Sequence, residues 1–248
     1  MRLDNRTCLI TGAGRGIGRA LALAFDAAGC DTFLVDLDYD TAGETARMCK
    51  REARVYKCDI SDYAAVTNLV ESLEFWGVDI LVNNAGVGAV PTPFEKMTPE
   101  AWHKVMSVNL DGTAWMLSTV GRMMIRRGGD ASIVNIASMS GLVANRGFQN
   151  AVYNASKAAI IQLTRSLACE WAPHRIRVNA IAPGPIQTPM SDRVKERNPD
   201  LWREFGESRT LVGRWGRPEE VASLAVEVAG NTYMTGACVV IDGGYTAW

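Results

Sequence analysis

Residues 11–18 read TGAGRGIG, with glycine at every second position. The stretch TCLITG predicts a β-strand over 7–12, and IGRALALAFDAAG predicts a helix over 17–29. A glycine turn between a strand and a helix lets a phosphate approach the free N–H groups of the helix start, because no side chain intervenes. The sequence therefore predicts a pyrophosphate-binding turn in an α/β fold, with a tight ligand-free turn as the alternative.

The rest of the chain alternates in the same way. Further strands are expected at 31–38, 55–60, 78–86, 131–138, 176–184 and 237–244, and further helices at 41–52, 64–77, 99–129, 150–172 and 218–230. The strands are rich in Val, Ile and Leu without strict alternation, which is typical of a parallel sheet buried on both faces. We predict one Rossmann-like, doubly wound α/β domain over residues 1–248, with a seven-stranded parallel sheet flanked by helices on both faces. The irregular stretch at about 185–215 is expected to be a substrate loop or lid.

Composition excludes several other classes of protein. Hydrophobic residues make up 48%, charged residues 21%, and the net charge is −1, so a soluble globular enzyme fits and a nucleic-acid or membrane-surface binder does not. The start of the chain lacks the features of a signal peptide, and six scattered cysteines are expected to be reduced thiols. A cytoplasmic protein is predicted. Two distant histidines and no G-x-S-x-G segment argue against a metal site and a serine hydrolase.

Two residues bear on the choice of cofactor. Asp36 ends the second strand about 20 residues after the glycine turn, where a carboxylate can bind the adenosine ribose and would repel a 2′-phosphate. This favours NAD over NADP. Arg15, within the turn, favours NADP, since it could pair with that phosphate. Asp59 ends the third strand and is expected either at the adenine edge or as a simple helix cap.

The candidate acid–base residues lie in the second half. Tyr153 and Lys157 are four residues apart on a predicted helix and therefore share a face, where an ammonium group favours the phenolate. Ser138 ends the fifth strand, N-N-A-G (83–86) ends the fourth, and Asn109 lies within a long helix that also contains Gly112.

Taken together, T-G-x-x-x-G-x-G (11–18), N-N-A-G, Asn109, Ser138, Y-x-x-x-K (153–157), R-V-N (177–179) and P-G (183–184) resemble the short-chain dehydrogenase/reductase family over essentially the whole chain. The resemblance implies Tyr153 as general acid/base, Lys157 as the residue that lowers its pKa, Ser138 as the group that polarises the substrate oxygen, and Asn109 as support for a proton relay. It leaves Gly14 as the least constrained glycine of the turn. The implied cofactor-binding residues are Gly12, Arg15, Gly16, Ile17, Gly18, Asp36, Asp59, Ile60, Asn83, Ala85, Gly86, Tyr153, Lys157, Pro183, Gly184, Ile186 and Thr188.

One departure from the family concerns the serine. Fourteen residues separate Ser138 from Tyr153, where about twelve are usual, and twelve would separate Ser140 from it. Ser138 is preferred because it stands three residues before Gly141, and Ser140 remains the alternative.

The substrate is suggested by SMSG followed by Asn145, and by the ending GGYTAW, which resemble the polyol branch of the family (galactitol-, arabinitol- and xylulose-type enzymes). Ser138, Ser140, Asn145, Gln149, Asn150 and Tyr153 would contact the substrate, although the loop residues could instead satisfy the loop backbone. Trp202 and Trp248 could wall the pocket or belong to core or interface. The expected activity is NAD-dependent oxidation of a polyol or other secondary alcohol. Alternatives are an NADPH-dependent 3-oxoacyl thioester reductase and a non-catalytic dinucleotide-binding protein.

Assembly is the last expectation. Apolar stripes on the helices predicted at 99–129 and 150–172 exceed what one sheet face needs. The resemblance implies that these helices pair across a dimer interface and that the C-terminus helps to build a homotetramer.

Overall fold

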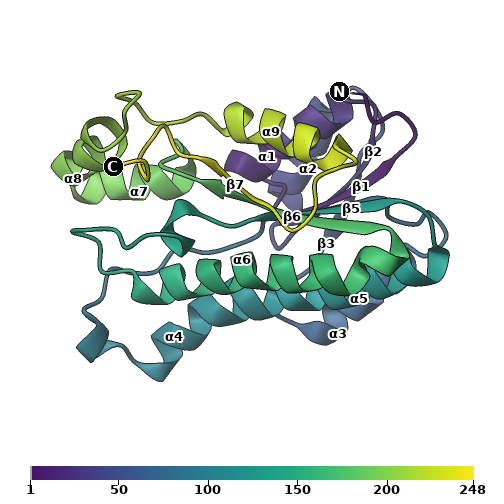
Figure 1. The fold of residues 1–248 in the computed structure, drawn as a ribbon, viewed down its shortest axis with the longest axis horizontal. Coiled ribbons are helices and arrows are strands. Elements are labelled where there is room, and N and C mark those ends of the chain that lie inside the picture. Colours follow the sequence, from purple (N-terminus) through teal and green to yellow (C-terminus); the bar gives the residue numbers. More distant parts are fainter. Residues whose placement is uncertain (1) are drawn as a thin grey trace.

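Seven parallel strands form one sheet through the middle of the molecule (Figure 1). The computed structural model describes residues 2–248, apart from the side chain of Arg193. The strand order is β3-β2-β1-β4-β5-β6-β7, which is that of a doubly wound fold. The strands are β1 (Thr7–Thr11), β2 (Asp31–Asp36), β3 (Arg54–Lys57), β4 (Ile80–Asn83), β5 (Ala131–Ile136), β6 (Ile176–Pro183) and β7 (Cys238–Ile241).

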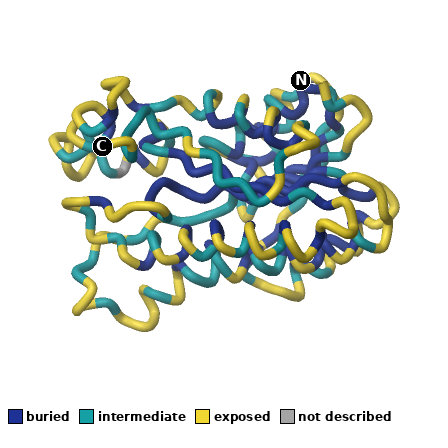
Figure 2. Tube along the Cα trace, viewed as in Figure 1, coloured by how far each residue is buried: buried dark blue, intermediate teal, exposed yellow. Residues whose placement is uncertain are grey.

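Helices cover both faces of this sheet (Figure 1). One layer holds α1 (Gly16–Ala27), α2 (Tyr39–Met48) and α9 (Pro218–Gly230), and the other holds α3 (Tyr63–Ser72), α4 (Pro99–Met106), α5 (Thr113–Arg127) and α6 (Ala151–Trp171). Neighbouring strand residues enter opposite layers: Ile10 and Leu34 pack with α1 and α9, whereas Leu9 and Phe33 pack with α3 and α5. The sheet is therefore buried on both sides (Figure 2), which explains why its strands do not alternate.

The predicted helix over 99–129 is in fact three consecutive pieces. Between α4 and α5, residues Ser107–Gly112 form a π-helical segment. A Cβ at Gly112 would lie 2.7 Å from Cγ1 of Ile60, so this glycine allows the segment to pack against the loop after β3. The widened turn places Asn109, which is fully buried, within the fold rather than on a regular helix face.

The prediction of an irregular stretch at 185–215 was wrong. It contains α7 (Pro189–Arg197), α8 (Pro199–Arg203) and a π-helical turn (Glu204–Ser208). Thr188 caps α7 through a capping box with Ser191, and the Asn198 side chain accepts from the N–H of Leu201 at the start of α8. A proline follows each cap, so the T-P and N-P pairs were helix-start signals. We call residues 185–212 the lid segment after its predicted role, which stays a prediction.

Most strands end earlier than predicted. Ser138 follows β5 by two residues, and Asp59, Ile60, Ala85 and Gly86 also lie in loops beyond their strands. All of these loops leave the carboxyl edge of the sheet, where ligands of open α/β sheets bind.

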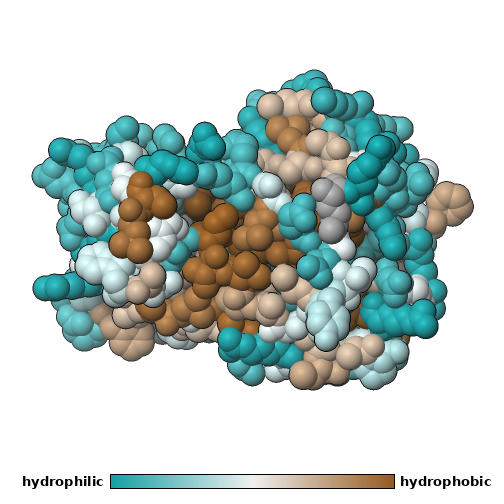
Figure 3. Space-filling model, turned by 45° about the horizontal axis from the view of Figure 1, so that its top comes forward, coloured by the Kyte–Doolittle hydropathy of each residue, from teal (hydrophilic) through white to brown (hydrophobic). Residues whose placement is uncertain are grey.

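Strand β7 is an edge strand that pairs only with β6. Its Val240 is 42% exposed. Figure 3 shows a broad apolar area in the middle of the face that it draws. No helix among residues 2–248 is both long and apolar enough to cross a bilayer.

Candidate active site

The glycine turn joins β1 to α1 as predicted. Gly12 and Gly16 have φ values of +65° and +54°, a region that favours glycine. A Cβ at Gly18 would lie 1.8 Å from the carbonyl oxygen of Gly12. Arg15 is the N-cap residue of α1, and its side chain makes no capping hydrogen bond. At the start of α1 the backbone is therefore uncovered at the glycines, and its free N–H groups suit an anion.

The description of Gly14 as least constrained was wrong. A Cβ at Gly14 would lie 2.3 Å from Oγ1 of Thr41 and 3.0 Å from Oδ2 of Asp36. The Gly14 N–H also donates to that carboxylate oxygen (2.8 Å). Gly14 is therefore fixed by α2 and by Asp36, through contacts with residues 22 or more positions away that no local pattern predicts.

Two residues that sequence reasoning missed hold the turn against β4. The Asn84 side chain donates to the carbonyl oxygens of Thr11 (3.0 Å) and Gly12 (3.1 Å). The Thr11 hydroxyl accepts the N–H groups of Asn84 and Ala85, both at 3.0 Å. The signal was available in the second asparagine of N-N-A-G and in the threonine before Gly12.

The role of Asn83 in shaping the cofactor floor stays a prediction. Its side chain is buried and donates to Oδ1 of Asn135 (2.9 Å), whose own amide donates to the hydroxyl of Thr164 (2.9 Å). These three residues link β4, β5 and α6. The Asn83 side chain therefore belongs to the interior, because it lies at the end of β4 on the face toward α6.

Asp36 and Arg15 both lie beside the turn, but only Arg15 has a charged partner. The Asp36 carboxylate accepts from the N–H groups of Gly14 and Asp38 (2.8 and 3.0 Å). Arg15 Nη2 lies 3.7 Å from Oδ2 of Asp38, and both side chains are about half exposed. Sequence reasoning missed Asp38, which also caps α2 by accepting from the N–H of Thr41 (3.2 Å).

Beyond β3, Asp59 does not cap a helix, since Asp62 is the N-cap residue of α3. The Asp59 carboxylate instead accepts from the N–H and hydroxyl of Ser61, at 2.9 and 2.7 Å. Ile60 is buried against Gly112. Asp59 is exposed, whereas its neighbour Ile60 is buried and anchors the loop after β3.

The predicted acid–base residues come together at the start of α6. Lys157 is 5% exposed, its Nζ donates to the carbonyl of Ile136 (2.9 Å), and it lies 5.8 Å from the centre of the Tyr153 ring. Burial lowers the pKa of Lys157 to about 8. Burial also raises the pKa of Tyr153, an effect that a hydrogen bond with Ser138 partly offsets. In the free protein the phenol is therefore held protonated.

Asn109 is placed next to Lys157 by the π-helical segment. Its side chain accepts from the N–H of Val87 (2.8 Å) and donates to the carbonyl of Val87 (3.0 Å) and to Ser156 (3.2 Å). A Cβ at Gly86 would lie 3.2 Å from Oδ1 of Asn109 and 3.7 Å from Nζ of Lys157. Because Gly86 has no side chain, the polar groups of Asn109 and Lys157 can both approach its backbone.

The two serines have different surroundings. Ser138 Oγ accepts the N–H of Ser140 (3.1 Å), and Ser138 also bonds to Tyr153. Ser140 Oγ accepts from the side chain of Asn145 (2.6 Å). This geometry favours Ser138 as the partner of Tyr153.

Of the other predicted substrate residues, Asn145 is buried and its Oδ1 has no hydrogen-bond partner among the described residues, whereas Gln149 is exposed. The Gln149 backbone carbonyl accepts from the N–H of Thr92 (2.9 Å). Asn145 is therefore a buried acceptor that could receive a hydroxyl group.

The residues predicted at the nicotinamide end lie after β6. A Cβ at Gly184 would lie 2.5 Å from Cα of Asp242, so Gly184 is in close contact with the end of β7. Thr188 is 3.4 Å from the Cβ position of Gly16, which brings the lid segment to the glycine turn. Pro183 and Ile186 are buried beside them.

The tryptophans do not both line this region. Trp202 stacks on Trp215, with 4.9 Å between ring centres, and belongs to an aromatic cluster of the lid segment. Trp248 is 78% exposed.

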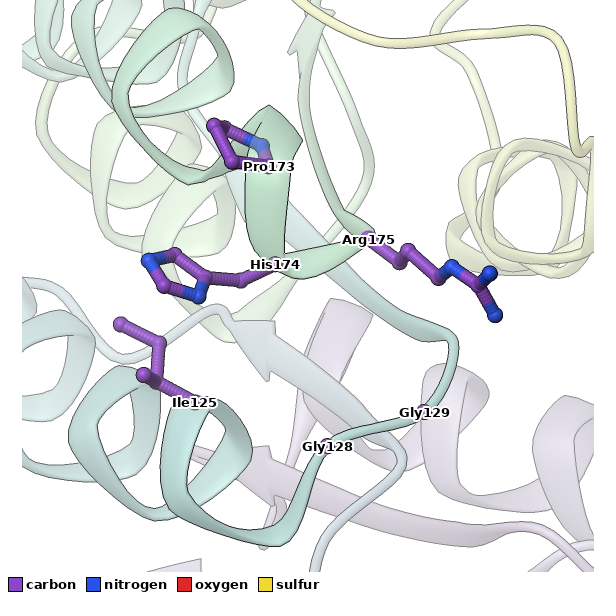
Figure 4. A pocket seen from close by; sticks show the side chains of 6 residues that line it. All are labelled: Ile125, Gly128, Gly129, Pro173, His174 and Arg175. Atoms are coloured by element: carbon purple, nitrogen blue, oxygen red, sulfur yellow. The ribbon is translucent and has the colours of Figure 1, made fainter.

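Two hollows of the described surface bear on the position of the site. One, of about 320 Å³, borders Gly16 and Thr188 beside the glycine turn. The other, of about 270 Å³, is lined by Ile125, Gly128, Gly129, Pro173, His174 and Arg175 (Figure 4). The second hollow lies where β5 and β6 begin, at the opposite edge of the sheet from the glycine turn, and has no part in the candidate site.

Comparison with known proteins gives consistent matches over the whole chain. The family pattern described as "Enoyl-(Acyl carrier protein) reductase" matches residues 12–246. Galactitol 2-dehydrogenase (L-tagatose-forming) of Cereibacter sphaeroides is 40% identical over 252 residues, covering 100% of this chain and 97% of that protein. The 3-oxoacyl-[acyl-carrier-protein] reductase of Thermotoga maritima is 37% identical over 251 residues, covering 98% and 99%. A short-chain type dehydrogenase/reductase from Mycobacterium marinum superposes with a TM-score of 0.94 at 33% identity, covering 100% of this chain and 98% of that one.

Proposed function

Since the chain belongs to the short-chain dehydrogenase/reductase family and is an oxidoreductase acting on CH–OH groups, we propose that it is an NAD-dependent dehydrogenase of polyols. The observation that supports this most directly is that Ser138 bonds to Tyr153 near Lys157, while Asn145, bonded to Ser140, carries a buried acceptor without a partner among the described residues.

The residues present fit a dinucleotide. Gly12 and Gly18 let the turn close tightly, since a Cβ would lie 2.8 Å from Cα of Ala85 or 1.8 Å from the Gly12 carbonyl oxygen, and the start of α1 lacks a side-chain cap. Asp36 would hold the adenosine ribose, and Lys157 the nicotinamide ribose. Arg15 is paired with Asp38, so the one cation of the turn is partly neutralised. This pairing favours NAD, since a free Arg15 would attract a 2′-phosphate.

When bound, the nicotinamide ring supplies the site that accepts or returns the hydride. The protein residues handle the proton. Tyr153 Oη takes the proton of the substrate hydroxyl during oxidation and returns it during reduction. Ser138 orients and polarises the same substrate oxygen.

Lys157 acts through charge. Its ammonium group lies 5.8 Å from the centre of the Tyr153 ring, where a positive charge would favour the phenolate once the substrate and cofactor are bound. Asn109, whose Oδ1 lies near the same side of Gly86 as Nζ of Lys157, would support the relay that carries the proton toward solvent.

The polyol assignment rests on a second polar group near the reacting oxygen. Ser140 and Asn145 form a buried pair next to Ser138, and Oδ1 of Asn145 is left without a partner. Since a buried acceptor without a hydrogen bond is destabilising, a neighbouring substrate hydroxyl would be favoured there. The galactitol 2-dehydrogenase relative is named for such a substrate.

A 3-oxoacyl thioester reductase is the second candidate, supported by the 37% identical relative. A panel of galactitol, threitol, glycerol and a 3-oxoacyl thioester, each with NAD(H) and NADP(H), separates the two. We expect the highest kcat/KM with a polyol and NAD. Turnover of the thioester with NADPH alone would reject the polyol assignment.

The assembly is expected to be a homotetramer in the cytoplasm. The partly exposed edge strand β7 supports the tetramer, and the free cysteines support the cytoplasmic location. The mass of the protein in solution tests the tetramer.

A further inference from the structure

Arg209 connects three separate segments of the chain. Its Nη1 donates to the carbonyl of Arg146 (2.5 Å) and to the hydroxyl of Tyr245 (3.4 Å), and its Nη2 donates to Oε1 of Glu204 (2.5 Å). The side chain is only 18% exposed. Arg146 lies in the loop before α6, Glu204 in the lid segment, and Tyr245 in the tail after β7.

The same three segments also meet through aromatic rings. The rings of Phe148 and Phe205 are 4.4 Å apart, and those of Phe205 and Tyr245 are 5.3 Å apart. Phe148 belongs to the loop, Phe205 to the lid segment and Tyr245 to the tail. Arg209 therefore adds directional hydrogen bonds to a junction that is already packed.

The loop over residues 142–150, here the substrate loop, carries Asn145. Its hydrogen bonds to other parts of the chain include Asn145 Nδ2 to Ser140 Oγ (2.6 Å), Thr92 N–H to the Gln149 carbonyl (2.9 Å), and Arg209 to the Arg146 carbonyl. Leu142, Val143 and Arg146 are exposed, so little burial holds this part of the loop. The residue that Arg209 holds is the immediate neighbour of Asn145.

We propose that Arg209 is a positioning residue that holds the substrate loop against the lid segment, so that Asn145 keeps its acceptor aimed at a substrate hydroxyl. The inference rests on the proposed function only for the identity of that substrate. The role requires arginine, because the planar guanidinium group carries several donors and can bond to a carbonyl, a carboxylate and a phenol at once. A lysine at this position has a single nitrogen and could not span the three partners.

The tests use the full-length enzyme and three variants. Arg209→Met keeps most of the apolar stem and removes all donors, whereas Arg209→Lys restores one donor group. Arg203→Met is the matched control, since Arg203 pairs with Asp200 within α8 on the exposed surface (2.9 Å). Kinetics with the best polyol, fluorescence titration with NADH, and hydrogen–deuterium exchange are measured for each.

For Arg209→Met, we expect the KM for polyol to rise about tenfold, a ratio that corresponds to about 1.4 kcal/mol of loop ordering. The expected change in kcat is smaller than that in KM, and the dissociation constant for NADH stays within about twofold. Arg209→Lys should recover part of the KM, and Arg203→Met should match the parent protein.

Exchange separates this inference from the proposed function. Faster exchange confined to residues 142–150 and the lid segment in Arg209→Met, with α9 unchanged, supports the positioning role even if the natural substrate is not a polyol. Unchanged exchange in the substrate loop, or a loss of kcat with unchanged KM, overturns it. Faster exchange throughout the chain would also overturn it, because Arg209 would then support the fold as a whole.

Discussion

Lys157 Nζ lies 5.8 Å from the centre of the Tyr153 ring, while its hydrogen bond goes to the carbonyl of Ile136 (2.9 Å). The ammonium group is thus fixed by the end of β5, the strand that also leads to Ser138. This hydrogen bond therefore links the start of α6, which carries Tyr153, to the end of β5. The arrangement places a buried positive charge close to the phenol of Tyr153.

Replacing this buried charge should change how stability depends on pH. The pKa of Lys157 is lowered to about 8 in the folded protein, against 10.5 in the unfolded chain. Between these values the unfolded state binds more protons, so this group makes the free energy of unfolding rise with pH, by about 3 kcal/mol in total. The rise should be absent in Lys157→Met. Denaturant titrations at pH 7.5 and 10 measure it, and equal pH dependence in both proteins would contradict the buried-charge assignment.

Asp38 should influence cofactor choice through Arg15. Asp38→Asn removes the charge that pairs with Arg15 at 3.7 Å, while asparagine still caps α2. The freed arginine should raise kcat/KM with NADP about two- to fivefold, as expected for a half-exposed ion pair. The same substitution in an Arg15→Ala background is the control. An equal gain in both backgrounds would show that Arg15 is not the mediator.

Substitutions of Ser138 and Ser140 should have different effects on the kinetics. Ser138→Ala removes the partner of Tyr153 and should lower kcat about 10²-fold or more. Ser140→Ala removes only the hydroxyl that receives the Asn145 amide, so it should mainly raise the KM for polyol. Steady-state kinetics of both variants decide between them, and the reverse pattern would make Ser140 the catalytic serine.

The glycine turn should tolerate no side chain at Gly18. A methyl group there would lie 1.8 Å from the Gly12 carbonyl oxygen, so Gly18→Ala should weaken NADH binding and lower the melting temperature. Gly43→Ala in α2 meets only Nη1 of Arg47 at 3.7 Å and should stabilise the protein by up to about 1 kcal/mol. Thermal unfolding and NADH titration test both, and unchanged NADH affinity in Gly18→Ala would reject a cofactor-binding role for the turn.

Much of the fold could be predicted from the sequence because apolar periodicity and glycine turns report local conformation. The order of strands and helices and the seven-stranded parallel sheet were confirmed. The π-helical segment could not be predicted, since it depends on the contact between Gly112 and Ile60, which lie 52 positions apart. The lid helices were missed although their caps, Thr188 and Asn198, were visible.

The candidate site was predictable where a motif fixes a position, as for Tyr153 and Lys157. It was not predictable where a partner comes from elsewhere in the chain. Asp38 beside Arg15 and Arg209 beside Arg146 illustrate this, because only the folded chain places them together. Asn83 shows that a residue within a motif can direct its side chain into the interior.

The central claim, that Tyr153 transfers the proton in polyol oxidation, is tested most directly by Tyr153→Phe. This variant keeps the ring and removes only the hydroxyl. The account predicts that kcat for polyol oxidation with NAD falls by about 10²- to 10⁴-fold, while the dissociation constant for NADH is unchanged within about twofold. A Tyr153→Phe enzyme that retains most of the parent turnover would contradict the account.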